Sequence, residues 1–369
     1  MKKYISCILS IAMIFLFIGC TQKKAENVRE KDRFDIKEAN KIVDAYIKSI
    51  TDEKYDEASR LLTEKVKSNT GEIKPNDLKI KGYKTEEMTE SGGEGSFRVK
   101  VVKSNASNPE TQVLDYRIKV IKDGIDYKIN EIKTSNFKEA FKDFDSIRIR
   151  KENSVETYLV TKFDGLPKYA YSKDDNAKMK SQVIPKDNYG IITLDYTGDL
   201  IALSTIGSNN TFVGILTFDD AVSTQGGAGG SKKGGGDQGD QQGGKDQQGG
   251  AEGKNLKEKP IGKELISCDI IENGKLENMV FSKDEKLLAV QYTKGNNKSI
   301  KVYNVGSGDL IKTKFEEEYP LGKVDVIFMR FEKEKMLYRV LPKNEQDKNN
   351  EYVGDWELDL KSFKIKKAE

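Results

Sequence analysis

The side chains that most often perform chemistry in proteins are scarce in this chain. Its 369 residues include no histidine and three cysteines, Cys7, Cys20 and Cys268. The lack of histidine excludes histidine general bases and histidine metal ligands. Cys268 lies in the strand-like run 265–270, and without a histidine to activate its thiol we interpret it as structural. Carboxylate pairs such as Asp174-Asp175 and Asp219-Asp220 are interpreted as solvated turns, because 33% of all residues are charged. We therefore predict no catalytic residue, cofactor or metal ligand.

The formal net charge is only +3, and removal of Lys2 and Lys3 with a signal segment would leave about +1. A surface of mixed charge lacks the positive excess that nucleic-acid binding requires, so no nucleic-acid partner is expected. The abundance of Lys, Asn, Ile and Glu resembles the composition of low-GC Gram-positive bacteria.

The first residues have the pattern of a secretory signal. Lys2 and Lys3 precede an apolar run from Ile5 to Ile18, and a polar segment follows Cys20. A helix of about 14 residues rises roughly 20 Å, which is too short for a membrane core of about 30 Å. A positive start, a short apolar run and a small residue before the cut favour a signal peptide over residues 1–19.

Phe17-Ile18-Gly19-Cys20 resembles the lipobox of bacterial lipoproteins, with Phe17 where Leu is commonest. The resemblance implies that Cys20 becomes the first residue and carries a diacylglycerol, whose two chains give stable anchoring. An ordinary secretory peptide with an accidental cysteine is the alternative. Residues 20–34 are charged and nearly free of apolar side chains, so we expect a flexible tether. The expected location is the outer face of a cell membrane.

A helix is predicted to begin after Asp35, with Asp35 as N-cap and Glu38 as its capping-box partner. Its apolar face would hold Ala39, Ile42, Val43, Tyr46, Ile47 and Ile50, and a second helix is predicted from Tyr55 to Val66. Alternation then predicts strands, with a hairpin of Val113–Lys122 and Tyr127–Ile132 around Asp123-Gly124. Leu114, Tyr116, Ile118 and Val120 share one face of the first strand of that hairpin.

Two helices before an antiparallel sheet are typical of an α+β domain, here residues 35–146. The segments "VDAYIKSITDEKYDEASRLLTEKV" and "YRIKVIKDGIDYKINEI" resemble the cone-shaped nuclear transport factor 2-like (cystatin-like) domains. Some members of that family are enzymes with an Asp–His pair, which this chain cannot have. Others are binding or dimerisation modules, so the resemblance implies no activity.

Residues 147–369 are predicted to be all-β. Three stretches, which begin at Tyr189, Met279 and Met329, each contain alternating strands and turns at a spacing that suits propeller blades. The second and third resemble WD-repeat or TolB-type β-propeller blades, and Val155–Ile184 is a candidate fourth unit. A closed propeller usually has 4–8 blades. An incomplete propeller, or a sandwich of the same hairpins, is therefore an alternative.

Residues 223–258 are rich in Gly and lack large apolar side chains, so we predict a disordered loop between adjacent strands.

The expected function is a non-enzymatic binding or scaffolding module. Its partners would be membrane lipid through Cys20 and a protein at the cell surface. A lipoprotein that binds a small ligand or senses a signal is the main alternative, and a carboxylate-dependent hydrolase is a further one. Core packing is the default role of Tyr46 and Tyr55, with an aromatic ligand pocket as the alternative.

Overall fold

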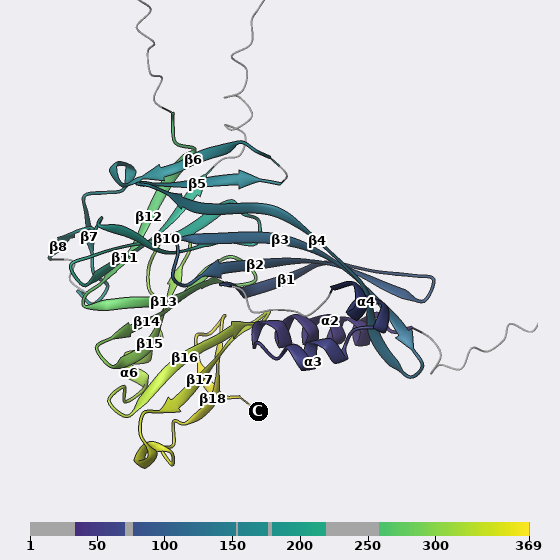
Figure 1. Ribbon diagram of the computed structural model, residues 1–369. Coiled ribbons are helices and arrows are strands. Elements are labelled where there is room, and N and C mark those ends of the chain that lie inside the picture. Colours follow the sequence, from purple (N-terminus) through teal and green to yellow (C-terminus); the bar gives the residue numbers. More distant parts are fainter. Residues whose placement is uncertain (1–33, 71–76, 153, 176–178, 219–257, 369) are drawn as a thin grey trace, which may run out of the picture.

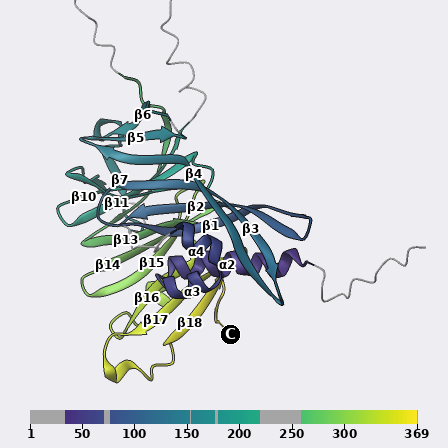
Figure 2. The same ribbon diagram turned by 45° about the vertical axis from the view of Figure 1, so that its right-hand side comes forward.

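The computed structural model describes residues 34–70, 77–152, 154–175, 179–218 and 258–368. Strands dominate these residues, and Figures 1 and 2 show several sheets that follow one another, with the helices beside the first of them. Cys20, the rest of the predicted tether up to residue 33, and all of the Gly-rich segment except Glu258 lie outside the described residues.

Helix α2 (Ile36–Thr51) begins where the sequence predicts. The Asp35 side chain accepts hydrogen bonds from the backbone N–H groups of Lys37 (2.8 Å) and Glu38 (3.4 Å), as an N-cap does. The second half of the predicted capping box is wrong. The Asp35 N–H donates to the Tyr127 hydroxyl at 2.7 Å, and the Glu38 carboxylate pairs with Lys41 instead. The helix start is thereby tied to the sheet.

The predicted second helix is divided into α3 (Tyr55–Arg60) and α4 (Glu64–Thr70). Between them, Leu62 forms a parallel bridge with Ile129 of the sheet. The Ile129 N–H donates to the Leu61 carbonyl, and the Thr63 N–H donates to the Ile129 carbonyl, both at 2.9 Å. A pairing with a strand 67 residues further along the chain thus takes the backbone groups that a continuous helix would use.

The first sheet is antiparallel in the order β1-β2-β3-β4-β5-β6. Its strands are β1 (Leu78–Ser91), β2 (Glu94–Asn105), β3 (Glu110–Asp123), β4 (Asp126–Asp143), β5 (Ser146–Lys151) and β6 (Thr157–Lys162). The predicted hairpin is confirmed, with Lys122 opposite Tyr127 and Ile118 opposite Ile132. The boundary predicted between residues 146 and 147 lies inside β5, so this sheet extends past it.

Both faces of the first sheet are partly covered. Helices α2 to α4 pack on one face, where Leu114, Tyr116, Ile118 and Val120 join the helix core on the side predicted from their alternation. The other face carries Val102, Val113 and Ala140, which pack against the second sheet. The first sheet is therefore the wall between two hydrophobic cores.

The second sheet contains β9 (Asn188–Leu194), β10 (Leu200–Gly207), β11 (Asn210–Phe218) and β12 (Gly262–Ile271). The third contains β13 (Gly274–Phe281), β14 (Leu287–Lys294) and β15 (Asn297–Asn304). The fourth contains β16 (Val324–Phe331), β17 (Lys335–Pro342), β18 (Gly354–Asp359) and β19 (Ile365–Lys367). Separate apolar cores join the second sheet to the third and the third to the fourth. This series of antiparallel meanders agrees with the predicted propeller-like character.

The candidate fourth unit, Val155–Ile184, is not a blade. Its strand β6 joins the first sheet, and only the short pair β7 (Tyr169–Tyr171) and β8 (Ser181–Val183) remains. The local pattern identified strands, but β6 pairs with β5, which directly precedes the unit, and β7 and β8 pair only with each other. The predicted placement of the Gly-rich segment between adjacent strands is confirmed, because Phe218 at the end of β11 lies opposite Gly262 at the start of β12.

Helix α2 also faces the fourth sheet, through a charged stripe of Asp44, Lys48 and Asp52. Asp44 interacts electrostatically with Lys283 and Arg330, Lys48 with Asp355, and Asp52 with Arg339. These residues are spaced by four along α2 and therefore share one side of the helix. These interactions add a charged component to the approach of the first unit to the third and fourth sheets, whereas consecutive sheets pack through apolar cores.

One close approach between the first two sheets gives a test of this packing. A Cβ atom on Gly82 would lie 2.3 Å from the hydroxyl oxygen of Tyr196, a buried residue of the β9–β10 turn. We expect Gly82→Ala to lower the free energy of unfolding by about 1–3 kcal/mol in urea denaturation, through overpacking. In a Tyr196→Phe background the cost should shrink, since the next ring atom is 3.2 Å away.

The matched control is Gly322→Ala, because nothing lies within 4 Å of the Cβ position at Gly322. An equal loss of stability for Gly82→Ala in both backgrounds would contradict this packing of β1 against Tyr196.

Candidate functional site

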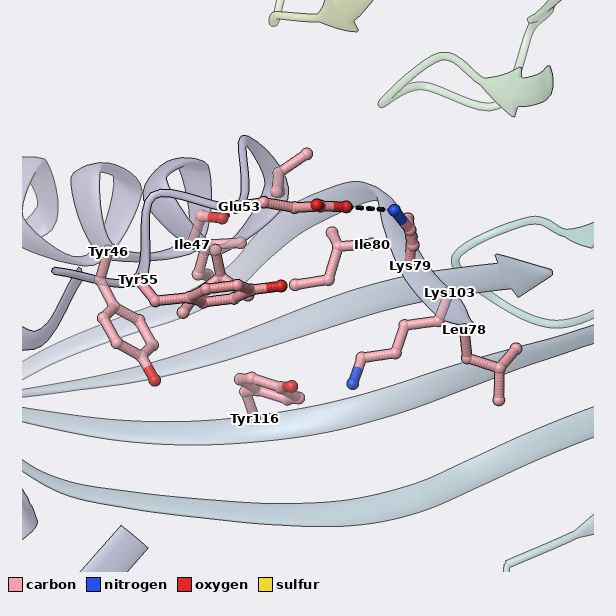
Figure 3. A pocket seen from close by; sticks show the side chains of 11 residues that line it. Tyr46, Ile47, Glu53, Tyr55, Leu78, Lys79, Ile80, Lys103 and Tyr116 are labelled. Atoms are coloured by element: carbon pink, nitrogen blue, oxygen red, sulfur yellow. Dashed lines mark hydrogen bonds and ion pairs between the residues drawn. The ribbon is translucent and has the colours of Figure 1, made fainter. Parts of the chain in front are cut away.

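A pocket lies between α2 and the helix-facing side of the first sheet (Figure 3). It is a cavity of about 130 Å³ where the apolar stripe of α2 diverges from β1 and β2. A register shift between Ile80 and Gly82 bends β1 beside it. The lining residues come from α2, the turn after it, α3 and three strands: Tyr46, Ile47, Ile50, Thr51, Glu53, Tyr55, Leu78, Lys79, Ile80, Lys103 and Tyr116.

Three tyrosines, Tyr46, Tyr55 and Tyr116, line the pocket. Tyr46 is buried in the helix core, as its helical spacing predicts, whereas Tyr55 is half-buried and lines the pocket. Burial raises the pKa of both Tyr46 and Tyr116. These phenols stay neutral near physiological pH and can donate or accept a hydrogen bond.

Lys103 is the cation of the inner wall. In Figure 3 its side chain runs along the sheet toward Tyr116. Burial lowers the pKa of Lys103, and no carboxylate of the described residues forms an ion pair with it. The pocket therefore places an ammonium group without a counter-ion beside neutral phenols and aliphatic side chains. Sequence reasoning missed Lys103, because its alternation within β2 does not reveal which cavity the strand borders.

The rim of the pocket is closed by an ion pair between Glu53 and Lys79. Glu53 follows the C-terminus of α2 with φ of 58°, in the left-handed region, and its N–H donates to the Ile50 carbonyl at 3.1 Å. The hydrogen-bonded pair raises the pKa of Lys79. Glu53 is the one carboxylate among the described lining residues, and Lys79 engages it.

A second charged cluster is buried between β7, β12 and β15. The Lys301 ammonium lies 2.6 Å from Asp174 and 3.0 Å from Asp269, and the Tyr303 hydroxyl donates to Asp269 at 2.7 Å. The Lys173 N–H also donates to Asp269, at 2.7 Å. Each group has a partner of opposite charge or a hydrogen bond, so this cluster joins the sheets. Lys173, Asp174 and Lys301 also line an adjacent hollow of about 190 Å³, but their charges are already paired.

Of the two carboxylate pairs singled out in the sequence, Asp174-Asp175 lies within the described residues. Asp174 is held by Lys301 and Lys294, and Asp175 accepts from the Lys180 N–H at 2.9 Å. Asp219-Asp220 and Cys20 lie outside the described residues. Within those residues, no three acidic or cysteine side chains gather to hold a metal ion, and no helix is long and apolar enough to cross a membrane.

Cys268 is buried on β12, between the second and third sheets. Burial, with the nearby Asp269 charge, raises the pKa of its thiol to about 12. The thiol stays protonated and is a poor nucleophile, which agrees with a structural role.

Ser135 and Lys138 stand at Ser-x-x-Lys spacing, which sequence reasoning passed over. They lie on β4, and the Lys138 ammonium donates to the Gly198 carbonyl and pairs with Asp199, both at 2.9 Å. A lysine bound in this way is not available as the base of a serine nucleophile.

Glu316 of the short helix α6 (Phe315–Glu318) lies near the charged cluster of Lys301, Asp174 and Asp269. The pH dependence of stability therefore tests this arrangement. Although much of Glu316 is exposed, its carboxylate accepts a hydrogen bond from the hydroxyl group of the buried Tyr292. Burial, with the charges of Asp174, Asp269 and Glu317, raises the pKa of Glu316 from 4.5 to about 7. The folded state then binds this proton more tightly than the unfolded state. The contribution of Glu316 to stability therefore declines as pH rises from 4.5 through about 7.

We expect Glu316→Gln to remove that part of the decline in urea denaturation measured across this pH range. Glu318→Gln, on the same helix, is the control and should retain it. Identical pH profiles for Glu316→Gln and the unaltered protein would refute the assignment.

No family model and no curated protein matches this chain. Among solved structures, it is similar to a prolyl endopeptidase with 9% identity and a TM-score of 0.26, over 77% of this chain and 42% of that one. It is also similar to Hsv2 from Kluyveromyces marxianus (8% identity, TM-score 0.27, 72% of this chain and 90% of that one). A third similar structure is a putative 6-phosphogluconolactonase from Bacteroides uniformis, with 12% identity and a TM-score of 0.23, over 74% of this chain and 80% of that one. The chain spans less than half of the prolyl endopeptidase, and at these scores we infer no activity from any of the three.

Proposed function

We propose that the protein is a lipid-anchored, extracytoplasmic binding protein. The support for the anchor is the signal-like start, Gly19-Cys20 at the end of its apolar run, and the polar segment that follows. Acyl chains on Cys20 would hold the folded part at the outer face of the membrane. Residues 20–34 would act as the tether.

The pocket beside α2 is the proposed ligand site. The observation that carries this proposal is the half-buried Lys103 ammonium, which lies among neutral tyrosines and forms no ion pair with a described carboxylate, since Glu53 of the same lining is paired with Lys79. An anionic group on the ligand would balance that charge, and the aliphatic side chains of Ile47 and Ile80 suit an apolar body. The pocket of about 130 Å³ is somewhat smaller than a cavity near 150 Å³ that holds benzene, so a small aromatic carboxylate would enter it only in part, with the rest of the ligand at its open side.

Residues 35–146 are proposed to be a nuclear transport factor 2-like unit, and the placement of α2 to α4 over one face of a bent sheet supports this. The later sheets are proposed to present their connecting turns to a protein partner at the cell surface.

Binding is favoured over hydrolysis because Glu53, the carboxylate of the described pocket lining, is paired with Lys79. A carboxylate-based hydrolase would need two acidic groups facing one substrate.

The anchor is tested by mass spectrometry of the native protein from a bacterial host. We expect loss of residues 1–19 and a diacylglyceryl group on Cys20, with partition into a detergent phase. Cys20→Ala should abolish both, whereas Cys7→Ala should leave both unchanged, since Cys7 lies within the removed segment. An intact N-terminus, or an unmodified thiol at Cys20, would overturn this part of the proposal.

The pocket is tested by calorimetric titration of the purified chain with benzoate and phenylacetate. We expect Lys103→Met to weaken binding at least tenfold, equivalent to about 1.4 kcal/mol, because the counter-charge is lost. Lys37→Met, which removes an exposed charge from the start of α2, should leave affinity unchanged.

Uncharged benzyl alcohol should bind less tightly than benzoate, and benzoate affinity should fall at alkaline pH as Lys103 loses its proton. If neither carboxylate binds, or both lysine variants lose affinity equally, the pocket is not the ligand site.

A further inference from the structure

The face of the first sheet that lies opposite the helices has a covered part and an open part. Val102 and Val113 lie under the second sheet. Farther along the same strands, Lys100 and Asp115 are still buried and lie 3.5 Å apart. Beyond them, toward the β1–β2 and β3–β4 turns, the side chains become exposed. This open end is the protruding part of the sheet in Figure 1.

Three cations lie directly opposite one another across this open end. Arg98 of β2 is opposite Arg117 of β3, and Arg117 is opposite Lys133 of β4. Side chains that face each other on adjacent strands have Cβ atoms about 5 Å apart, and like charges in such positions destabilise a sheet. A row of this kind indicates a place where negative charge from outside would be favourable.

Two of the three cations are held by neighbouring acids. The Arg98 guanidinium binds the buried Asp115 carboxylate through Nε at 2.9 Å and through a terminal nitrogen at 2.8 Å. Lys133 lies 2.5 Å from Glu131, which also binds Lys119 at 3.0 Å. Asp115 thereby fixes the plane of the Arg98 guanidinium and leaves its remaining terminal nitrogen only a long contact of 3.5 Å with Glu87.

Arg117 differs from its neighbours. It is exposed at the centre of the row, and no carboxylate among the described residues forms an ion pair with it. Its guanidinium therefore keeps a fork of N–H donors for a group from solution. The adjacent hollow of about 420 Å³ is lined by Arg98, Arg117, Lys119 and Lys133, by the hydroxyl groups of Thr89 and Ser96, and by Glu87 and Glu131.

We propose that this groove binds a phosphate-type oxyanion, with Arg117 as its principal ligand and Arg98 beside it. The planar fork of arginine matches the oxygens of phosphate in a two-pronged hydrogen bond. One bound anion would balance the charge of Arg117, since Arg98 and Lys133 already pair with Asp115 and Glu131. The groove and the helix-side pocket lie on opposite faces of the sheet, so this proposal is independent of the proposed function.

The test is isothermal titration of the full chain at low ionic strength with inorganic phosphate and, separately, with pyrophosphate. A second arm measures binding to phosphatidylglycerol vesicles against phosphatidylcholine vesicles, which separates a soluble phosphate from a lipid headgroup. Arg117→Gln should weaken binding at least tenfold in whichever arm shows it. Arg60→Gln is the matched control, because Arg60 is an exposed arginine on α3 at the helix side of the sheet.

Binding that survives in Arg60→Gln and is lost in Arg117→Gln, with circular dichroism unchanged, supports the site. The arm that shows the binding identifies the source of the oxyanion. No binding in either arm, or equal loss in both variants, overturns it. Benzoate titration of the same Arg117→Gln protein should give an unchanged affinity, so the two sites are judged separately.

Discussion

The structure depends on the burial of one sheet from both sides. Strands β2 and β3 place apolar side chains alternately under the helices and under the second sheet, so the same backbone serves two cores. Burying apolar area is the main favourable contribution to folding, and a sheet shared between two cores couples the helical unit to the series of later sheets. The buried Lys138 ammonium strengthens this coupling, since it reaches from β4 to Asp199 of the second sheet.

Both proposed sites arise where this burial ends. On the helix side, α2 diverges from β1 and β2 and leaves Lys103 and Tyr116 beside a cavity. On the opposite side, the second sheet covers only part of the strands, and the uncovered end presents Arg98 and Arg117. In each place a positive side chain is positioned by a rigid sheet and not by a loop, which favours a fixed geometry for a ligand.

Features that depend on local sequence could be predicted. The Asp35 cap, the apolar stripe of α2 and the β3–β4 hairpin each follow from spacing over a few residues. The interruption after α3 could not be predicted, because it depends on the distant strand residue Ile129. Strand β6 was assigned to a separate unit although its partner β5 is its neighbour in the chain, because alternation within a strand does not show which strand it pairs with.

To predict the candidate sites, one must know which residues lie opposite one another on paired strands, and not only where the strands are. Alternation placed Arg117 on the face opposite Tyr116, as the structure does, but it did not show that Arg98 and Lys133 lie directly across from it. Likewise, Tyr46 was recognised as a core residue, but its neighbour Lys103 comes from a strand 57 residues later. Pairing between strands fixes these neighbours, and a single sequence does not reveal it.

The charged stripe of Asp44, Lys48 and Asp52 interacts with the later sheets through charges, whereas consecutive sheets pack through apolar side chains. Apolar contacts between consecutive sheets hardly respond to dissolved ions at moderate concentration, whereas attraction between partly exposed charges is screened over a Debye length of about 8 Å at physiological ionic strength. The fourth sheet is therefore drawn toward α2 by charge interactions that weaken as the salt concentration around the protein rises. Its attachment to the third sheet does not share that dependence, so dilute surroundings tighten the assembly on one side only.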